Sequence, residues 1–281
     1  MNSLAKRLIT ACVAIPAIIL LIVLLPYKNY LAFSAAITIA CFIGNVEMRR
    51  MIERTGCRVS KFAYLGALIP AVEYIDYEFI PSSSPLVVFY ISIVIGLIFA
   101  SLVFSSSEDN FKSVIQNASA SILNVIYPGL FAGFMTKFGF LPDGRWMILF
   151  FFVLVFGSDS FAYFTGILFG KNNKGIIKVS PNKSIAGYIG GILIPALISM
   201  AAAFIFPSHF TYNPAAGFLI GFIVSVFAAI GDLIESAFKR SAGVKDSGVA
   251  IPGRGGMLDS IDSLIIAAPV YFLLMEFFLG A

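Results

Sequence analysis

Long apolar runs constrain this chain of 281 residues more than any other feature of its sequence. Each run is long enough, as a helix, to cross the roughly 30 Å hydrocarbon core of a bilayer. The runs lie near residues 8–25, 30–46, 62–79, 86–104, 115–141, 146–169, 185–206, 215–238 and 261–280. They predict an all-α, polytopic integral membrane protein with about nine transmembrane helices. The third run carries three carboxylates near its end, so a half-span or an interfacial helix is an alternative there.

The composition and the placement of charge agree with this class of protein. Charged residues make up 12% of the chain, about half the share usual in soluble domains, which argues against a water-soluble enzyme. With the N-terminus in the cytoplasm, 16 of the 19 lysines and arginines fall on the cytoplasmic side, as the positive-inside rule requires. We therefore expect a cytoplasmic N-terminus and an external C-terminus. The compact chain, with no transit peptide or long tail, favours the inner membrane of a bacterium over an organelle. Because the basic residues lie in short loops, we expect no nucleic-acid partner.

The chain divides by its polar content. Residues 1–110 are expected to form a lipid-embedded scaffold of transmembrane helices, and residues 111–281 a catalytic transmembrane domain with a polar motif at 236–262. Several glycine pairs at four-residue spacing are typical of close helix packing. These pairs are Gly129/Gly133, Gly166/Gly170, Gly187/Gly191 and Gly217/Gly221. Such small-residue helix faces also suit a homodimer, with contacts in the N-terminal part.

Ionisable residues inside the apolar runs are concentrated late in the chain. A charge at membrane depth costs a few kcal/mol, so each one is a functional candidate with an expected partner. Asp159 interrupts the sixth run, where a buried structural role is as good an interpretation as ligation of an ion. The eighth run and its end place four polar residues on one helix face that finishes at the cytoplasm: Asp232, Glu235, Ser236 and Lys239.

A glycine-rich loop and two further aspartates follow that helix face. The segment Pro252–Gly256 offers free backbone N–H groups directly before a helix start, an arrangement that cradles phosphates. Asp259 and Asp262 share a face of the first helical turns, where two carboxylates repel unless a cation lies between them; Mg²⁺ is the simplest choice. Alone, a glycine-rich loop is weak evidence and an aspartate at a helix start is more often a cap. Their conjunction with four nearby cations favours a phosphate-and-metal site.

This segment resembles the signature of the phosphatidate cytidylyltransferase, or CDP-diacylglycerol synthase, family. The family pattern reads S-x-x-K-R-x₄-K-D-x₅-P-G-H-G-G-x₂-D-R-x-D, and residues 236–262 match every fixed position except two. Arg254 replaces the family histidine and Ser260 the family arginine. Two weaker stretches are also similar, at 159–166 and at 180–187, the latter with Ala186 in place of a glutamate. The resemblance covers residues 145–270 well and the first 110 only by hydropathy.

The resemblance implies the reaction and the roles of the residues that carry it. CTP and phosphatidic acid would give CDP-diacylglycerol and pyrophosphate at the cytoplasmic face of the membrane, with Mg²⁺ and room for a second cation such as K⁺. Direct catalytic roles fall to Lys239, Arg240, Lys245, Asp246, Arg254 and Asp259. Nucleotide and phosphate contacts fall to Ser180, Lys183, Ser236, Lys239, Gly253, Arg254, Gly255 and Gly256. The metal ligands would be Asp232, Asp259 and Asp262.

The departures and the competing functions are part of this hypothesis. Arg254 preserves anion binding, with bidentate geometry, but excludes the proton transfer that a histidine offers. A CTP-dependent polyprenol or lipid kinase would share the helical architecture, but would transfer the γ-phosphate to an alcohol. An ion-coupled transporter would use the intramembrane carboxylates as an ion path, yet the sequence shows no convincing repeat and its charges cluster in one half.

Overall fold

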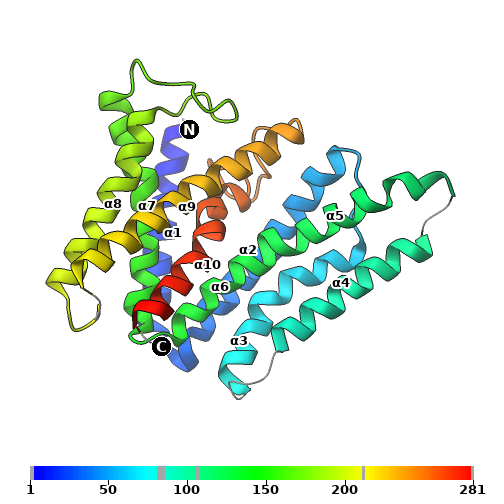
Figure 1. The fold of residues 1–281 in the computed structure, drawn as a ribbon, viewed down its shortest axis with the longest axis horizontal. Coiled ribbons are helices and arrows are strands. Elements are labelled where there is room, and N and C mark those ends of the chain that lie inside the picture. Colours follow the sequence, from blue (N-terminus) through cyan, green and yellow to red (C-terminus); the bar gives the residue numbers. More distant parts are fainter. Residues whose placement is uncertain (1–2, 81–85, 106–107, 211–212, 280–281) are drawn as a thin grey trace. The chain divides into compact units, whose positions relative to one another are not determined.

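The computed structural model describes residues 3–80, 86–105, 108–210 and 213–279, and these residues are helical apart from connecting loops and two isolated β-bridges (Figure 1). The α-helices, in chain order, are α1 (Ser3–Leu24), α2 (Tyr27–Arg54), α3 (Ile69–Phe79), α4 (Leu86–Ser105), α5 (Val114–Val125), α6 (Phe131–Lys137), α7 (Gly144–Phe169), α8 (Ile185–Ile205), α9 (Pro214–Ser241) and α10 (Leu258–Leu279). Short 3₁₀ segments occur at η1 (Lys61–Leu68), η2 (Glu108–Ser113) and η4 (Phe138–Phe140), and a π-turn at η3 (Ile126–Leu130). The all-α prediction is thus confirmed.

Seven helical segments in the described part are long and apolar enough to cross a membrane. They are α2, α4, the segment Phe111–Phe140, α7, α8, α9 and α10. Each coincides with one of the nine predicted runs. Of the remaining two runs, the first contains a shorter apolar helix, Cys12–Leu24, and the third divides into η1 and α3. Pro70 lies in the first turn of α3, where its missing N–H is tolerated, so it marks the start of a new helix.

The chain forms two compact units, and α9 and α10 contribute to both. The first unit contains Met1–Lys137 and Phe238–Ile261, and the second contains Phe138–Ala237 and Asp262–Ala281.

Buried polar groups in the first unit find partners across the chain. The Asn45 side chain of α2 donates to the backbone carbonyls of Ala63 and Asn124, at 3.1 and 2.9 Å, and accepts from the Asn124 amide at 3.0 Å. Glu73, one of the carboxylates of the divided third run, is 3% exposed at its side chain and pairs with Lys137 at 3.1 Å. Because a buried charge is costly without a partner, this pair fixes α3 against α6.

Glycines allow helices to approach closely in both units, as the four-residue spacing predicts. In the first unit, a Cβ at Gly129 would overlap the carbonyl oxygen of Gly66. In the second, a Cβ at Gly191 would lie 2.8 Å from the Ser158 carbonyl oxygen, and one at Gly221 2.8 Å from the Pro195 carbonyl oxygen. Since these glycines pack against the chain's own helices, the homodimer stays a prediction that rests on the sequence alone.

Replacing Gly129 with alanine tests this packing. The added Cβ meets backbone, which cannot move aside as a flexible side chain can, so we expect a loss of about 1–3 kcal/mol in unfolding free energy and a lower melting temperature in detergent. Gly96 of α4 is the matched control, because no atom lies within 4 Å of a Cβ built there. Gly96→Ala should melt at or above the wild-type temperature; equal melting of the two variants would contradict the packing argument.

Candidate functional site

The loop between α9 and α10 has a defined conformation that begins with the end of α9. The Gly243 N–H donates to the Arg240 carbonyl at 3.1 Å and the Val244 N–H to the Lys239 carbonyl at 2.9 Å. With Gly243 left-handed at φ +66°, these bonds form a Schellman cap, which ends the helix and satisfies its last carbonyls. The cap therefore fixes where the chain leaves α9, directly after the Lys-Arg pair of the signature.

The glycine-rich part of the loop is a tight turn rather than an open strand. The Ile251 and Gly255 backbones bond to each other in both directions, at 2.8 and 3.0 Å, around the left-handed Gly253. Gly255 is also left-handed, at φ +113°, and a Cβ on it would lie 2.7 Å from the Asp259 carboxylate. Both the backbone conformation and the lack of space thus require glycine at position 255.

The carboxylate of Asp259 organises this loop. Its Oδ1 accepts from the Lys239 ammonium at 2.7 Å. Its Oδ2 accepts from the Gly256 N–H at 2.7 Å and from both the N–H and the hydroxyl of Ser247 at 2.8 Å. The Asp259 side chain is 7% exposed, so these charge-assisted bonds supply the compensation that a buried carboxylate needs. Asp259 and Lys239, both predicted catalytic residues, are brought together, and Ser247, which was not predicted, joins them.

A second buried carboxylate, Glu47 of α2, holds the same loop and was not predicted. Its Oε1 accepts from the Met257 N–H at 3.0 Å, and its Oε2 from the Leu258 N–H at 2.9 Å and the Ser247 hydroxyl at 3.3 Å. Glu47 is 3% exposed. The predicted apolar run ends at residue 46, before Glu47, but α2 continues to Arg54 and carries Glu47 into the interior. The only signal in the sequence is an acidic residue at the end of an apolar run that is otherwise followed by arginines.

Glu47, rather than Asp259, satisfies the N–H groups at the start of α10. The sequence left open whether Asp259 is a cap or a functional carboxylate. In the structure the N–H groups of Met257 and Leu258 donate to Glu47. The Asp259 carboxylate instead accepts from the N–H groups of Ser247 and Gly256, which precede α10. The negative charge of Glu47 at this end is also favourable toward the helix dipole.

The other predicted cationic and acidic residues at the end of α9 and in the loop after it lie at the surface of the first unit. Arg240, Lys245, Asp246 and Arg254 are exposed. Their exposure leaves the three cations accessible to an anionic ligand, in contrast to the partly buried Lys239.

In the second unit, a lysine and two aspartates from three elements form a separate polar cluster. Lys183, in the loop before α8, forms an ion pair with Asp232 of α9. Burial lowers the pKa of Lys183, but the carboxylates of Asp232 and Asp159 outweigh it, so the pKa lies above its ordinary value. The Tyr188 ring lies 5.7 Å from the Lys183 ammonium. Lys183 is therefore charged at any physiological pH, and its positive charge interacts with the carboxylates of both Asp159 and Asp232.

The loop that carries Lys183 is closed by backbone bonds at both ends. Gly175 N–H donates to the Lys183 carbonyl at 3.4 Å, and Ile185 N–H to the Asn173 carbonyl at 3.0 Å. Ser184 caps α8, because its hydroxyl accepts from the Gly187 N–H at 3.1 Å. The Lys183 N–H donates to the backbone carbonyl of the predicted Ser180 at 3.2 Å.

The predicted metal ligands have the right donor chemistry, since carboxylate oxygens are the ligands that Mg²⁺ prefers. Two of them, Asp232 and Asp259, pair with lysines as described above. Asp262 is buried, and its Oδ1 accepts from the Ser263 N–H at 2.7 Å. Among the described residues, no group of three or more His, Cys, Asp or Glu side chains is placed to hold a metal ion.

Comparison with known proteins confirms the resemblance that the signature indicates. Residues 5–278 match the sequence model of the cytidylyltransferase family. A phosphatidate cytidylyltransferase of Staphylococcus aureus (strain COL) is 32% identical over 262 residues, which cover 92% of this chain and 96% of the relative. Proteins of the same name from Staphylococcus haemolyticus (strain JCSC1435) and Staphylococcus epidermidis (strain ATCC 12228) are 32% and 31% identical, covering 78% and 85% of this chain and 90% and 97% of their own. The chain therefore belongs to the cytidylyltransferase family.

Proposed function

We propose that this chain transfers the cytidylyl group of CTP to phosphatidate, giving CDP-diacylglycerol and pyrophosphate. The observation that carries the proposal is the similarity to relatives of that name over 92% of this chain. In this chain the signature segment folds around the Asp259 carboxylate. The reaction makes one bond and breaks one. A phosphate oxygen of phosphatidate attacks the α-phosphorus of CTP, and the bond from that phosphorus to the bridging oxygen of the β-phosphate breaks, so pyrophosphate leaves.

For this reaction the protein must position the two substrates and neutralise their charge, and a strong base is not required. A phosphate monoester, with a second pKa near 6, is already mostly a dianion at neutral pH. What opposes the reaction is repulsion between the lipid phosphate and the triphosphate, together with the charge that develops on the leaving group. The exposed Arg240, Lys245 and Arg254 are suited to neutralise these charges. The left-handed turn at Gly253 and Gly255 places the exposed Arg254 between them. The N–H groups of Arg254, Gly255 and Gly256 are bonded within the loop, so the exposed side chains are the groups proposed to bind the phosphates.

Mg²⁺ is part of the proposal, with Asp232, Asp259 and Asp262 as its ligands and a second cation such as K⁺ beside it. When bound, the metal would neutralise phosphate charge in the transition state. Its chemistry fits the carboxylates that the sequence indicates, and the lysines paired with Asp232 and Asp259 show that both carboxylates attract cations. A divalent ion on either carboxylate would take over the role that the ammonium group plays in this structure.

We also propose that the chain crosses a bacterial inner membrane nine times, with a cytoplasmic N-terminus and active site. The seven candidate spans support this count if α1 and the η1–α3 segment also cross. The distribution of lysine and arginine supports the orientation.

The Asp259 carboxylate should be essential for CDP-lipid formation. Asp259→Asn removes the charge that holds Lys239 and turns an amide toward the donors of Ser247 and Gly256, so we expect a loss of activity of about 100-fold or more. Pyrophosphate release and CDP-lipid from labelled CTP are measured in detergent, with Mg²⁺ and after its removal by EDTA, which should abolish both.

Glu53→Gln is the control, because Glu53 is 43% exposed and pairs only locally with Arg49. Wild-type rates in Asp259→Asn would contradict the assigned role. CDP and a lipid phosphate as products from a polyprenol would instead identify the kinase, and a folded protein that ignores CTP would point to the transporter.

Glu47 should act as a positioning residue for the loop. In Glu47→Gln one oxygen becomes an NH₂ group that faces backbone donors, which leaves a buried N–H unsatisfied at a cost of about 1–3 kcal/mol. We expect a lower melting temperature and a fall of about tenfold or more in kcat/KM for CTP. Glu53→Gln on the same helix controls for loss of charge. If Glu47→Gln lowers the melting temperature but leaves kcat/KM unchanged, the residue has a structural role only.

Single cysteines test the orientation. In a variant with Cys12, Cys41 and Cys57 replaced by serine, we expect a membrane-impermeant maleimide to label Val249→Cys only from the cytoplasmic side. Val249 is 93% exposed, so accessibility within the loop does not limit the reaction. Ser208→Cys, in the exposed loop after α8, should be labelled only from outside. Inverted labelling of the two would overturn the proposed topology.

A further inference from the structure

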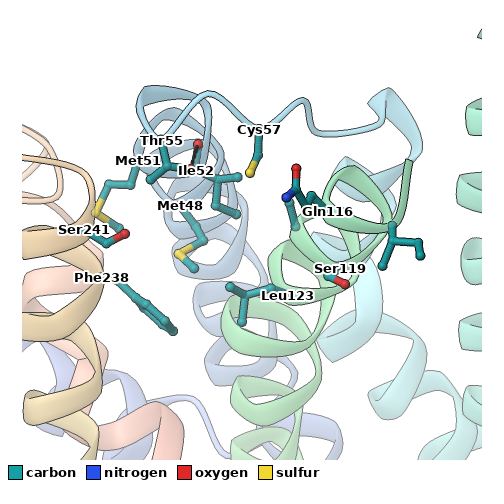
Figure 2. A pocket seen from close by; sticks show the side chains of 12 residues that line it. Met48, Met51, Ile52, Thr55, Cys57, Gln116, Ser119, Leu123, Phe238 and Ser241 are labelled. Carbon is teal, nitrogen blue, oxygen red and sulfur yellow. Dashed lines mark hydrogen bonds between the residues drawn. The ribbon is translucent and has the colours of Figure 1, made fainter. Parts of the chain in front are cut away.

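A cavity of about 440 Å³ opens in the first unit where α2 and α9 end and α5 begins (Figure 2). Its volume lies within the range of about 300–1,000 Å³ that is typical of small-molecule sites. Apolar side chains make up most of the lining, among them Met48, Met51, Ile52, Leu123 and Phe238. None of the twelve described residues that line the cavity is charged. A triphosphate would need cations in the lining, so the cavity suits a hydrocarbon chain better than a nucleotide.

One lining residue of the cavity is itself strongly exposed on an apolar segment. Ile115 of α5 belongs to the lining and is 80% exposed, on a segment apolar enough to span the membrane. A lipid tail entering here would exchange one apolar environment for another and would not have to cross water. Flexible methionines such as Met48 and Met51 adapt their shape to a chain that itself has many conformations.

Polar side chains that could bind the glycerol ester of a lipid also line the cavity. Figure 2 shows Gln116 and Ser119 of α5 on one wall of the cavity and Ser241 of α9 on the opposite wall. Hydroxyl and amide groups can donate to ester carbonyls. Phe238 and Ser241 both line the cavity, and the signature pair Lys239-Arg240 lies between them on α9.

From this placement we propose that the cavity holds one acyl chain of the phosphatidate substrate and thereby sets the position of its phosphate beside Arg240. The inference rests on the proposed function and adds the binding place of the lipid tail. A helix rises 1.5 Å per residue, so the backbone of the exposed Arg240 lies within one turn, along the axis of α9, of the lining residues Phe238 and Ser241.

Filling the cavity should discriminate between substrates by chain length. Ser119 is exposed and lines the cavity, so Ser119→Trp places an indole there without disturbing a buried position. We expect the ratio of kcat/KM for dioleoyl over dihexanoyl phosphatidate to fall about tenfold, the effect of losing contact with about two methylene groups. Ser92→Trp is the matched control, since Ser92 is an exposed serine of α4 outside this lining and should leave the ratio unchanged. An unchanged ratio in Ser119→Trp would overturn the proposal. An increase in KM for CTP with both lipids would overturn it in favour of the cytosine base as the occupant.

A photoreactive phosphatidate with a diazirine at the end of one acyl chain gives a readout that does not depend on turnover. We expect cross-links, located by mass spectrometry, to residues 48–52 and 119–123, and their loss in Ser119→Trp but not in Ser92→Trp. Cross-links confined to other helices in a protein that makes CDP-lipid would refute the acyl-chain site while the proposed function stands. If the wild-type protein makes no CDP-lipid from either phosphatidate, the proposed function itself fails.

Discussion

The buried carboxylate of Asp259 is the interaction on which the rest of the loop depends. Burying a carboxylate costs several kcal/mol of solvation free energy, and hydrogen-bond donors close to its oxygens must compensate for that cost. Asp259 obtains them from a helix end, through Lys239, and from both sides of the loop, through Ser247 and Gly256. The path of the chain between α9 and α10 brings all of these donors within 3 Å of the carboxylate. The requirement to satisfy this charge therefore ties the end of α9, the loop and the start of α10 together.

Glu47 extends this constraint to a helix that is distant in sequence. It shares the Ser247 hydroxyl with Asp259 and binds the first N–H groups of α10. The Glu47 side chain leaves no room for a Cβ at two positions of the loop. A Cβ at Gly248 would overlap the Glu47 carboxylate, and a Cβ at Gly256 would lie 2.6 Å from that carboxylate and overlap the Ser247 hydroxyl. Gly256 of the signature thus serves the approach of Glu47, whereas Gly253 and Gly255 serve the turn.

The sequence predicts the helices and the close glycine contacts well, because hydropathy and spacing are local patterns. It also selects Lys239 and Asp259, which the structure joins. It does not predict which polar groups pair, since Glu47 reaches the loop across more than 200 residues and Lys183 reaches Asp232 across 49. The third apolar run shows the same limit. Its carboxylates suggested a half-span, and the reason that Glu73 is tolerated, its pairing with Lys137, lies on another helix.

Burial separates the cations that the signature presents as equivalent. Lys239, 17% exposed, pairs with the buried Asp259 carboxylate. Arg240 near the end of α9, and Lys245 and Arg254 in the loop that follows, are exposed, so they can bind a ligand without first breaking this ion pair. Arg254 stands beside the left-handed Gly253 and Gly255, on the turn itself. A guanidinium at that position offers a planar pair of donors to a phosphate, which an imidazole does not. The departure from the family histidine therefore falls at a residue whose exposed position can accept the longer side chain, and it keeps a permanent positive charge on the turn.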